Sequence, residues 1–149
     1  MFVLDSKVVS ELRKAKAGKA DLNVTAWACG VSADVLYVSA ITVLELETGV
    51  LLVHRRYPRQ GALLRLWLDQ HVLPAFLARV WPVVTAVAQC CAALHVPDPG
   101  SERDALIAAT AMVHNMIVVT RNVANFAATG VPLINPWDPV AGPGERRAR

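Results

Sequence analysis

Hydrophobic residues gather in short runs along this chain, and longer amphipathic stretches separate the runs. Residues 2–5 (FVLD), 35–39 (VLYVS) and 116–120 (MIVVT) are rich in β-branched and aromatic side chains, which predicts buried β-strands. Weaker patterns at 78–83 (ARVWPV) and 131–135 (VPLIN) predict two further short strands. We therefore expect a chain with five strands, each followed by polar or helical sequence.

The stretches between the strands have the periodicity of helices. Pro58 is expected to end one long helix, and the next helix is expected to stop before Pro74. Strands that alternate with helices predict an α/β fold with three α/β/α layers and a mostly parallel central sheet. The helices are expected at about 6–13, 22–29, 39–58, 61–71, 85–95 and 101–115.

The length and composition indicate one domain. A chain of 149 residues can bury a single substantial core, and no internal repeat is visible. Residues 1–138 are assigned to this domain. Residues 139–149 (PVAGPGERRAR) are rich in Pro, Gly and Arg, so they are expected to form a disordered basic tail.

The hydrophobic content is high for a soluble protein, at 54%, with a mean hydropathy of +0.39. No stretch approaches the ~18 consecutive apolar residues of a membrane-spanning helix, and no secretory signal is visible at the N-terminus. A sheet buried on both faces, an apolar partner surface, or both would explain this composition. The three cysteines (Cys29, Cys90, Cys91) do not indicate a disulfide framework, so we expect buried thiols in a reducing, cytoplasmic compartment.

Basic residues form clusters, although the net charge is only +3. Each cluster could be a solvated helix face, and together they could bind a polyanionic partner. The clusters are Arg13, Lys14, Lys16 and Lys19; Arg55, Arg56, Arg59 and Arg65; and Arg146, Arg147 and Arg149.

Acidic residues are placed where the predicted strands end. Asp5 directly follows the first strand, and Glu45 lies in the helix that begins after the second. Asp104 lies in the first turn of a later helix. In open parallel sheets, ligands bind beyond the carboxyl ends of the strands, so these acids are candidates for one shared site.

Each acid also has a purely structural interpretation. Asp5 could cap the helix that follows it, and Asp104 could complete a capping box with Ser101. Glu45 is harder to explain in this way because it shares a helical face with apolar residues, where an unpaired carboxylate is costly. That face holds Ile41, Leu44, Thr48 and Leu52, whereas Glu47 projects to the opposite face with Val43 and Val50.

Carboxylates that converge at one end of a sheet repel each other and require a proton or a counterion. A hard divalent cation such as Mg²⁺ satisfies that requirement with a few carboxylates and several waters. Such an ion can activate water and stabilise charge on a phosphate. Together with the basic clusters, the acids favour metal-dependent phosphodiester hydrolysis.

Four segments resemble the PIN domains, and among them the VapC and FitB-like toxins of bacterial toxin–antitoxin systems. The segment FVLDSKVVSEL resembles the family's LDTNVVSEL, and YVSAITVLELETGV resembles SxITxxELxxGv. The segment RDALIAATAMVHNMIVVTRNVANF resembles D-xx-IAATAxxH-xxx-VTR[DN]xxDF, and GVPLINPW resembles the closing strand. The resemblance covers about residues 1–138 and is specific because all four segments occur in order.

The resemblance implies a Mg²⁺- or Mn²⁺-dependent endoribonuclease that cleaves RNA phosphodiester bonds with an activated water. The family's metal-binding acids fall on Asp5, Glu45 and Asp104, and its fourth acidic position falls on Asn122. Ser6 and Thr120 match hydroxyl positions that support the site in relatives. The resemblance also implies a homodimer or toxin–antitoxin hetero-oligomer with a VapB-like antitoxin, and contact with DNA only through that antitoxin.

The chain departs from the family pattern at three positions. Lys7 replaces an asparagine, Asn122 takes the place of the fourth acid, and Asn125 replaces an aspartate. An ammonium about 4 Å from a carboxylate interacts with it by roughly 4 kcal/mol at an effective dielectric of about 20, which competes with weak Mg²⁺ binding. Lys7 could therefore perturb the site, or it could extend to solvent and change little.

Two other functions compete with a nuclease. The three departures favour a catalytically weakened PIN-fold binding module that acts only through its antitoxin complex. A phospho-accepting receiver domain also has acids at strand ends, but it needs a lysine late in the chain after a strand. This chain has Thr120 and Arg121 there instead, which counts against the receiver.

Overall fold

The computed structural model describes residues 1–139. The predicted tail therefore lies outside the described residues from position 140 onward. Strands alternate with helices along the described chain, as the hydrophobic pattern predicts. The strands are β1 (Phe2–Leu4), β2 (Leu36–Ser39), β3 (Val80–Trp81), β4 (Ile117–Val119) and β5 (Leu133–Ile134).

The strands form one parallel sheet in the order β3-β2-β1-β4-β5. β1 lies at its centre, where Leu4 pairs with Val119 of β4 and Val3 pairs with Tyr37 of β2. Because the strands are parallel, their carboxyl ends meet at one edge of the sheet. The residues that follow β1, β2 and β4 lie at that edge.

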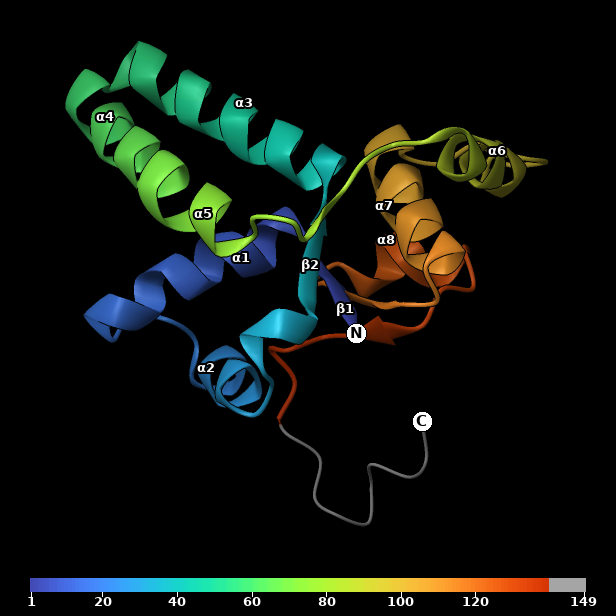
Figure 1. The fold of residues 1–149 in the computed structure, drawn as a ribbon, viewed down its shortest axis with the longest axis horizontal. Coiled ribbons are helices and arrows are strands. Elements are labelled where there is room, and N and C mark those ends of the chain that lie inside the picture. Colours follow the sequence, from blue (N-terminus) through green and yellow to red (C-terminus); the bar gives the residue numbers. More distant parts are fainter. Residues whose placement is uncertain (140–149) are drawn as a thin grey trace.

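Helices cover both faces of the sheet, which confirms the three-layer prediction (Figure 1). Helices α1 to α5 lie on one side, and α6 to α8 lie on the other. They are α1 (Ser6–Arg13), α2 (Leu22–Cys29), α3 (Ala40–Arg56), α4 (Pro58–Trp67), α5 (Leu73–Ala75), α6 (Thr85–Leu94), α7 (Glu102–Val113) and α8 (Val123–Ala127).

The side chains of β1 show why two helical layers form. Successive residues of a strand point to opposite faces. Leu4 packs into a core with Val8 of α1 and Leu46 of α3, whereas Val3 packs into a second core with Ile107 of α7. All five side chains except Leu46 are fully buried, and Leu46 is 7% exposed. An uninterrupted apolar run is thus required, because neither face of the strand meets water.

Two expectations about the helices were wrong. The helix expected to stop before Pro74 instead continues from α4 through a π-helical segment, Leu68–Val72, into α5. Pro74 lies where the π-helical segment passes into α5, so its missing N–H falls at a change in the helical hydrogen-bond pattern. Helix α8 was not predicted, because its five residues are too few to show a helical period.

The three cysteines are free, and only Cys91 is buried. Cys29 is exposed because it is the last residue of α2, which contradicts the expectation that all three thiols are buried. Within residues 1–139, none of the helices has the length and apolar character needed to cross a membrane.

Candidate active site at the carboxyl end of the sheet

Asp5 is the most deeply buried acid at this edge, with 4% of its surface exposed. It follows β1 directly and is the N-cap of α1, where its Oδ1 accepts a 2.7 Å hydrogen bond from the Ser6 backbone N–H. Its Oδ2 accepts a 2.8 Å hydrogen bond from the Thr120 hydroxyl. Asp5 therefore caps α1, as one interpretation predicted. Each of its oxygens has a further lone pair, so the carboxylate can also bind a cation.

Thr120 connects two neighbouring strands across this edge. It follows β4, and the pairing of β4 with β1 sets its side chain beside Asp5. The Thr120 hydroxyl also accepts a 3.0 Å hydrogen bond from the Asn122 backbone N–H. Since that hydroxyl has one proton, the bond from Asn122 leaves the proton directed at Asp5.

Glu45 enters the site from α3, which begins directly after β2. The Ser39 hydroxyl caps α3 by accepting a 3.0 Å hydrogen bond from the Ile41 N–H. Glu45 is half-buried one turn later, and its Oε1 is buried without a hydrogen-bond partner. Burial raises the pKa of Glu45, and the charges of Asp5 and Asp104 raise it further. A hydrogen bond with the Ser6 side chain and the charge of Arg103 act in the opposite direction.

The helical face that was expected to bury Glu45 is itself partly exposed. The face of α3 that packs into the core holds Thr42, Leu46 and Val50. Leu44 and Leu52, which share the predicted apolar face with Glu45, are 47% and 63% exposed. Glu45 is thus buried by the neighbouring end of the sheet and not by that face.

Glu47 is excluded from the site. Its carboxylate lies 2.8 Å from the Arg65 guanidinium, which belongs to α4. This pair ties α3 to α4 on the outer side of the helical layer.

Asp104 reaches the same edge from α7, in the opposite helical layer. The Ser101 hydroxyl caps α7 by accepting a 3.5 Å hydrogen bond from the Asp104 N–H, so half of the predicted capping box is present. Burial and the charge of Asp5 raise the pKa of Asp104. Side-chain hydrogen bonds with Ser101 and Asn125, and the charge of Lys7, lower it.

The residues of the predicted site therefore separate into two groups. The charge of Asp5 raises the pKa of both Glu45 and Asp104, and the charge of Asp104 raises that of Glu45. Ser6 and Thr120 bond to Asp5. Asn122 is set apart from these acids, because its backbone N–H bonds to Thr120.

The positions that depart from the family pattern also lie near the acids. Lys7 is exposed, and its charge reaches Asp104. Asn125, which the sequence showed only as a lost acid, lowers the pKa of Asp104 through its side chain. The charge of Arg103 lowers the pKa of Glu45. This second effect was not predicted, although Arg103 stands next to Asp104 in the sequence.

The donor set fits a hard divalent cation. Carboxylate and hydroxyl oxygens are the ligands that Mg²⁺ and Mn²⁺ prefer, and a buried, unpartnered Glu45 oxygen requires a cation or proton. Within residues 1–139, no three His, Cys, Asp or Glu side chains stand close enough to ligate one ion together. The charges of Asp5 and Asp104 act on Glu45, so like charges repel at this edge, and the side chains must move before all three carboxylates ligate one ion.

Comparison with known proteins agrees with this fold. The PIN domain family matches residues 2–131. The chain is 38% identical to the VapC ribonuclease Y4jK of Sinorhizobium fredii over 144 residues, which span 93% of this chain and 99% of that protein. It is 34% identical to the toxin FitB of Neisseria gonorrhoeae over 142 residues, which span 92% of this chain and 99% of FitB.

Solved structures give the same result. The structure of FitAB bound to an IR36 DNA fragment contains a chain that superposes with a TM-score of 0.82 at 32% identity, over 93% of this chain and 96% of that one. A toxin–antitoxin complex from Klebsiella pneumoniae, at 20% identity and a TM-score of 0.60, shares the fold over 91% of this chain and 98% of its own. The PIN family match over most of the chain and the two full-length relatives together show that this protein belongs to the PIN domain family.

Proposed function

We propose that this protein is the toxin of a toxin–antitoxin pair and acts as a metal-dependent endoribonuclease. The observation that carries the proposal is the meeting of Asp5, Glu45 and Asp104 at one end of the sheet, with a buried Glu45 oxygen that has no protein partner. The similarity to a ribonuclease and to a toxin over nearly the whole chain supports the same function.

Asp5, Glu45 and Asp104 are the proposed ligands of Mg²⁺ or Mn²⁺. A bound ion of this kind supplies an activated water and stabilises the negative charge that builds on the phosphate. The reaction is hydrolysis of an RNA phosphodiester bond, which leaves a 5′-phosphate and a 3′-hydroxyl. The carboxylates must be ionised to act as ligands, so their raised pKa values oppose metal binding at acidic pH.

Ser6 and Thr120 are proposed to orient the ligands. The Ser6 N–H and the Thr120 hydroxyl each hold one oxygen of Asp5, which fixes the plane of its carboxylate. The Ser6 hydroxyl also donates a 3.5 Å hydrogen bond to Asp5 Oδ1, and the Ser6 side chain lowers the pKa of Glu45. Such contacts position ligands without touching the substrate, and their loss typically reduces metal affinity or activity by about 10–100-fold. Asn122 assists through the N–H that orients the Thr120 hydroxyl.

The proposed partner is a VapB-like antitoxin that covers the site and holds the toxin inactive. The assembly is a homodimer or a toxin–antitoxin hetero-oligomer, and it contacts DNA only through the antitoxin. The related FitAB complex is described as bound to a DNA fragment. An RNA substrate and three free thiols fit a reducing cytoplasmic compartment.

Substitution of single acids tests the nuclease proposal. Purified Asp5→Asn, Glu45→Gln and Asp104→Asn proteins are expected to cleave labelled RNA about 100-fold more slowly or worse, because each loses a charged ligand. Calorimetric titration with Mn²⁺ should show weaker binding to each variant. Glu47→Gln is the matched control, since it makes the same change two residues along α3 and outside the site. Cleavage and Mn²⁺ affinity equal to wild type in Glu45→Gln would contradict the assignment of Glu45.

A catalytically weakened binding module is the second candidate. The observation that favours it is the charge of Lys7 beside Asp104, together with amides at Asn122 and Asn125 where relatives have acids. A protein of this kind would form the antitoxin complex normally but would not cleave RNA with either Mg²⁺ or Mn²⁺. Mapping of cleavage sites in total RNA from cells that express the chain without antitoxin distinguishes the two functions.

A further inference from the structure

Arg121 lies beside the acids at the carboxyl end of the sheet. It directly follows Thr120, whose hydroxyl bonds to Asp5. The backbone is fixed on both sides of Arg121. The Thr120 N–H donates a 2.9 Å hydrogen bond to the Ile134 carbonyl of β5, and the Asn122 N–H donates a 3.0 Å hydrogen bond to the Thr120 hydroxyl. The exposed side chain of Arg121 therefore starts from a defined place next to the site.

A tryptophan holds the Arg121 side chain. The guanidinium lies over the Trp137 ring, 5.1 Å from its centre. Trp137 is itself anchored, because its carbonyl accepts a 2.8 Å hydrogen bond from the Asn23 side chain of α2 and its N–H donates a 3.0 Å hydrogen bond to Asn135 Oδ1. The ring also packs against the core that contains Leu4. An arginine that rests on a fixed ring loses less conformational freedom when it binds a ligand.

Arg121 has no carboxylate partner within residues 1–139, where the ion pairs belong to Lys14 and Arg65. The cations whose charges lower the pKa values of the acids in the site are Arg103 and Lys7. Arg121 is therefore an exposed cation that neither neutralises these acids nor competes with a metal ion for them. Its guanidinium can bind an anion from outside the protein.

The order of the strands places Arg121 on one side of the acids. β4 lies between β1 and β5, so Arg121 stands between Asp5, which follows β1, and Trp137, which follows β5. Glu45 arrives on the other side, from the helix that follows β2. A single strand of RNA that has one phosphate at the acids and runs along this edge towards β5 brings a neighbouring phosphate to Arg121.

We propose that Arg121 binds a phosphate of the RNA substrate next to the phosphate at which cleavage occurs, and that Trp137 positions it for this contact. The planar guanidinium donates two parallel N–H bonds to phosphate oxygens, which a lysine ammonium does not reproduce. The indole ring supports the guanidinium and does not stack on a base. This inference rests on the proposed ribonuclease function and adds a substrate contact on the β5 side of the acids.

Direct RNA binding tests the contact without any need for cleavage. The probe is a fluorescently labelled single-stranded oligouridine, and its anisotropy is measured with the full-length protein in EDTA at several salt concentrations. Arg121→Gln is expected to make the slope of log affinity against log salt shallower by about 0.7, which is the contribution of one phosphate contact, and so to weaken binding about fivefold near 0.1 M salt. Arg121→Lys should keep the slope because it keeps the charge, but bind more weakly than wild type because it loses the planar fork.

A double-mutant cycle tests the positioning role of Trp137. Trp137→Leu is expected to weaken binding by at most about fivefold and to keep the salt slope, because the charge of Arg121 remains. It should have no further effect on affinity in the Arg121→Gln background, since the ring acts only through that guanidinium. Trp137→Phe should recover most of the affinity because it keeps an aromatic face. Equal losses from Trp137→Leu with and without Arg121 would overturn the positioning role.

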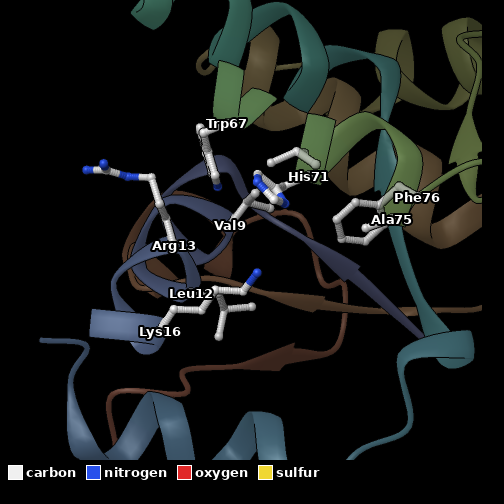
Figure 2. Close-up of a pocket in the computed structure, with 9 residues that line it drawn as sticks. Val9, Leu12, Arg13, Lys16, Trp67, His71, Ala75 and Phe76 are labelled. Carbon is white, nitrogen blue, oxygen red and sulfur yellow. The ribbon is translucent and has the colours of Figure 1, made fainter. Parts of the chain in front are cut away.

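A second stacked arginine provides the matched control. The Arg13 guanidinium lies 5.7 Å from the centre of the Trp67 ring, and both residues line a cavity between α1 and the segment from α4 to α5 (Figure 2). Arg13 follows Asp5 by eight residues, which places it about 12 Å further along the axis of α1. Arg13→Gln removes the same charge from the same kind of pair, so it should keep the affinity and the salt slope of wild type. Urea unfolding of each variant checks its fold.

The outcomes separate this proposal from the proposed function. Wild-type affinity and salt slope in Arg121→Gln would overturn the phosphate contact, whether or not the protein cleaves RNA. Equal losses in Arg121→Gln and Arg13→Gln would also overturn it, because binding would then follow overall charge, and so would the lack of measurable binding of oligouridine to wild type at low salt. If binding depended on Arg121 but wild type cleaved no RNA with Mn²⁺, the phosphate contact would hold and the nuclease function would fail.

Discussion

At the residue scale, Asp5 illustrates how one side chain can be both structural and chemical. Its two oxygens bind the Ser6 N–H and the Thr120 hydroxyl, so its position is set by α1 and β4 at once. Glu45 is held differently. One of its oxygens is buried and free of any protein partner, so this residue is the most sensitive to protons and cations.

Lys7 provides a prediction about metal affinity. Replacing it with asparagine, the residue of the family pattern at this position, is expected to raise the affinity for Mg²⁺ or Mn²⁺ by up to about fivefold, because an exposed charge pair contributes about 0.2–1 kcal/mol. Calorimetric titration of wild type and Lys7→Asn measures the change, and Lys14→Asn is the control for loss of one positive charge on the same segment. Equal affinities of wild type and Lys7→Asn would show that Lys7 extends to solvent without effect.

The raised pKa values of Glu45 and Asp104 give a prediction about pH. Between the ordinary pKa of each group and its raised value, the native protein binds more protons than the unfolded chain. The free energy of unfolding of the metal-free protein therefore falls as pH rises through that interval. Urea unfolding from acidic to neutral pH should show this loss, and Glu45→Gln should make the dependence weaker.

Metal addition should reverse that loss at neutral pH. An ion that binds only the native protein adds about 2.7 kcal/mol to the free energy of unfolding at a concentration of about 100 times its Kd. Urea midpoints with and without Mn²⁺ measure this stabilisation. If Asp5→Asn gained as much stability from Mn²⁺ as wild type does, the ion would bind elsewhere.

At the element scale, the hairpin of α3 and α4 depends on one close approach. Gly61 of α4 is buried against α3, and a Cβ atom at this position would stand 2.2 Å from the His54 Cα atom. Glu47 and Arg65 join the same two helices by an ion pair. The hairpin carries Trp67 toward α1, where it lines one cavity together with Val9 and Leu12.

Gly61→Ala is expected to destabilise the protein by about 1–3 kcal/mol, because the clash is with backbone and the helices must separate. Gly49→Ala in α3 is the matched control, since nothing lies within 4 Å of the added atom. That control should instead gain about 0.5–1 kcal/mol, the usual benefit of alanine over glycine within a helix. Urea unfolding measures both, and equal midpoints for the two variants would contradict the packing described here.

At the scale of the whole molecule, the parallel sheet assembles the site from distant parts of the chain. The order β3-β2-β1-β4-β5 places β1 between β2 and β4, so Asp5 lies between the elements that deliver Glu45 and Thr120. Asp104 arrives from the opposite helical layer. Four segments that span more than a hundred residues therefore converge on one edge.

Periodicity and motif were enough to predict the kinds of elements and the candidate residues of the site. Apolar runs must be buried, and strands without a polar face require helices on both sides, so the three-layer fold could be predicted from periodicity. The family resemblance located Asp5, Glu45 and Asp104 by motif. Element ends near Pro74 and the short α8 were missed, because local patterns carry little information over so few residues.

How these residues act on one another depends on which elements the folded chain brings together. Glu45 and Glu47 are assigned by their partners in the folded chain. Glu47 forms an ion pair with Arg65 of α4 and therefore does not belong to the site. The effect of Asn125 on the pKa of Asp104 and the approach of Arg13 to the Trp67 ring likewise join separate elements. These contacts depend on how the helices pack. The hydrophobic pattern of the sequence indicates which residues are buried, but it does not indicate which residues they contact.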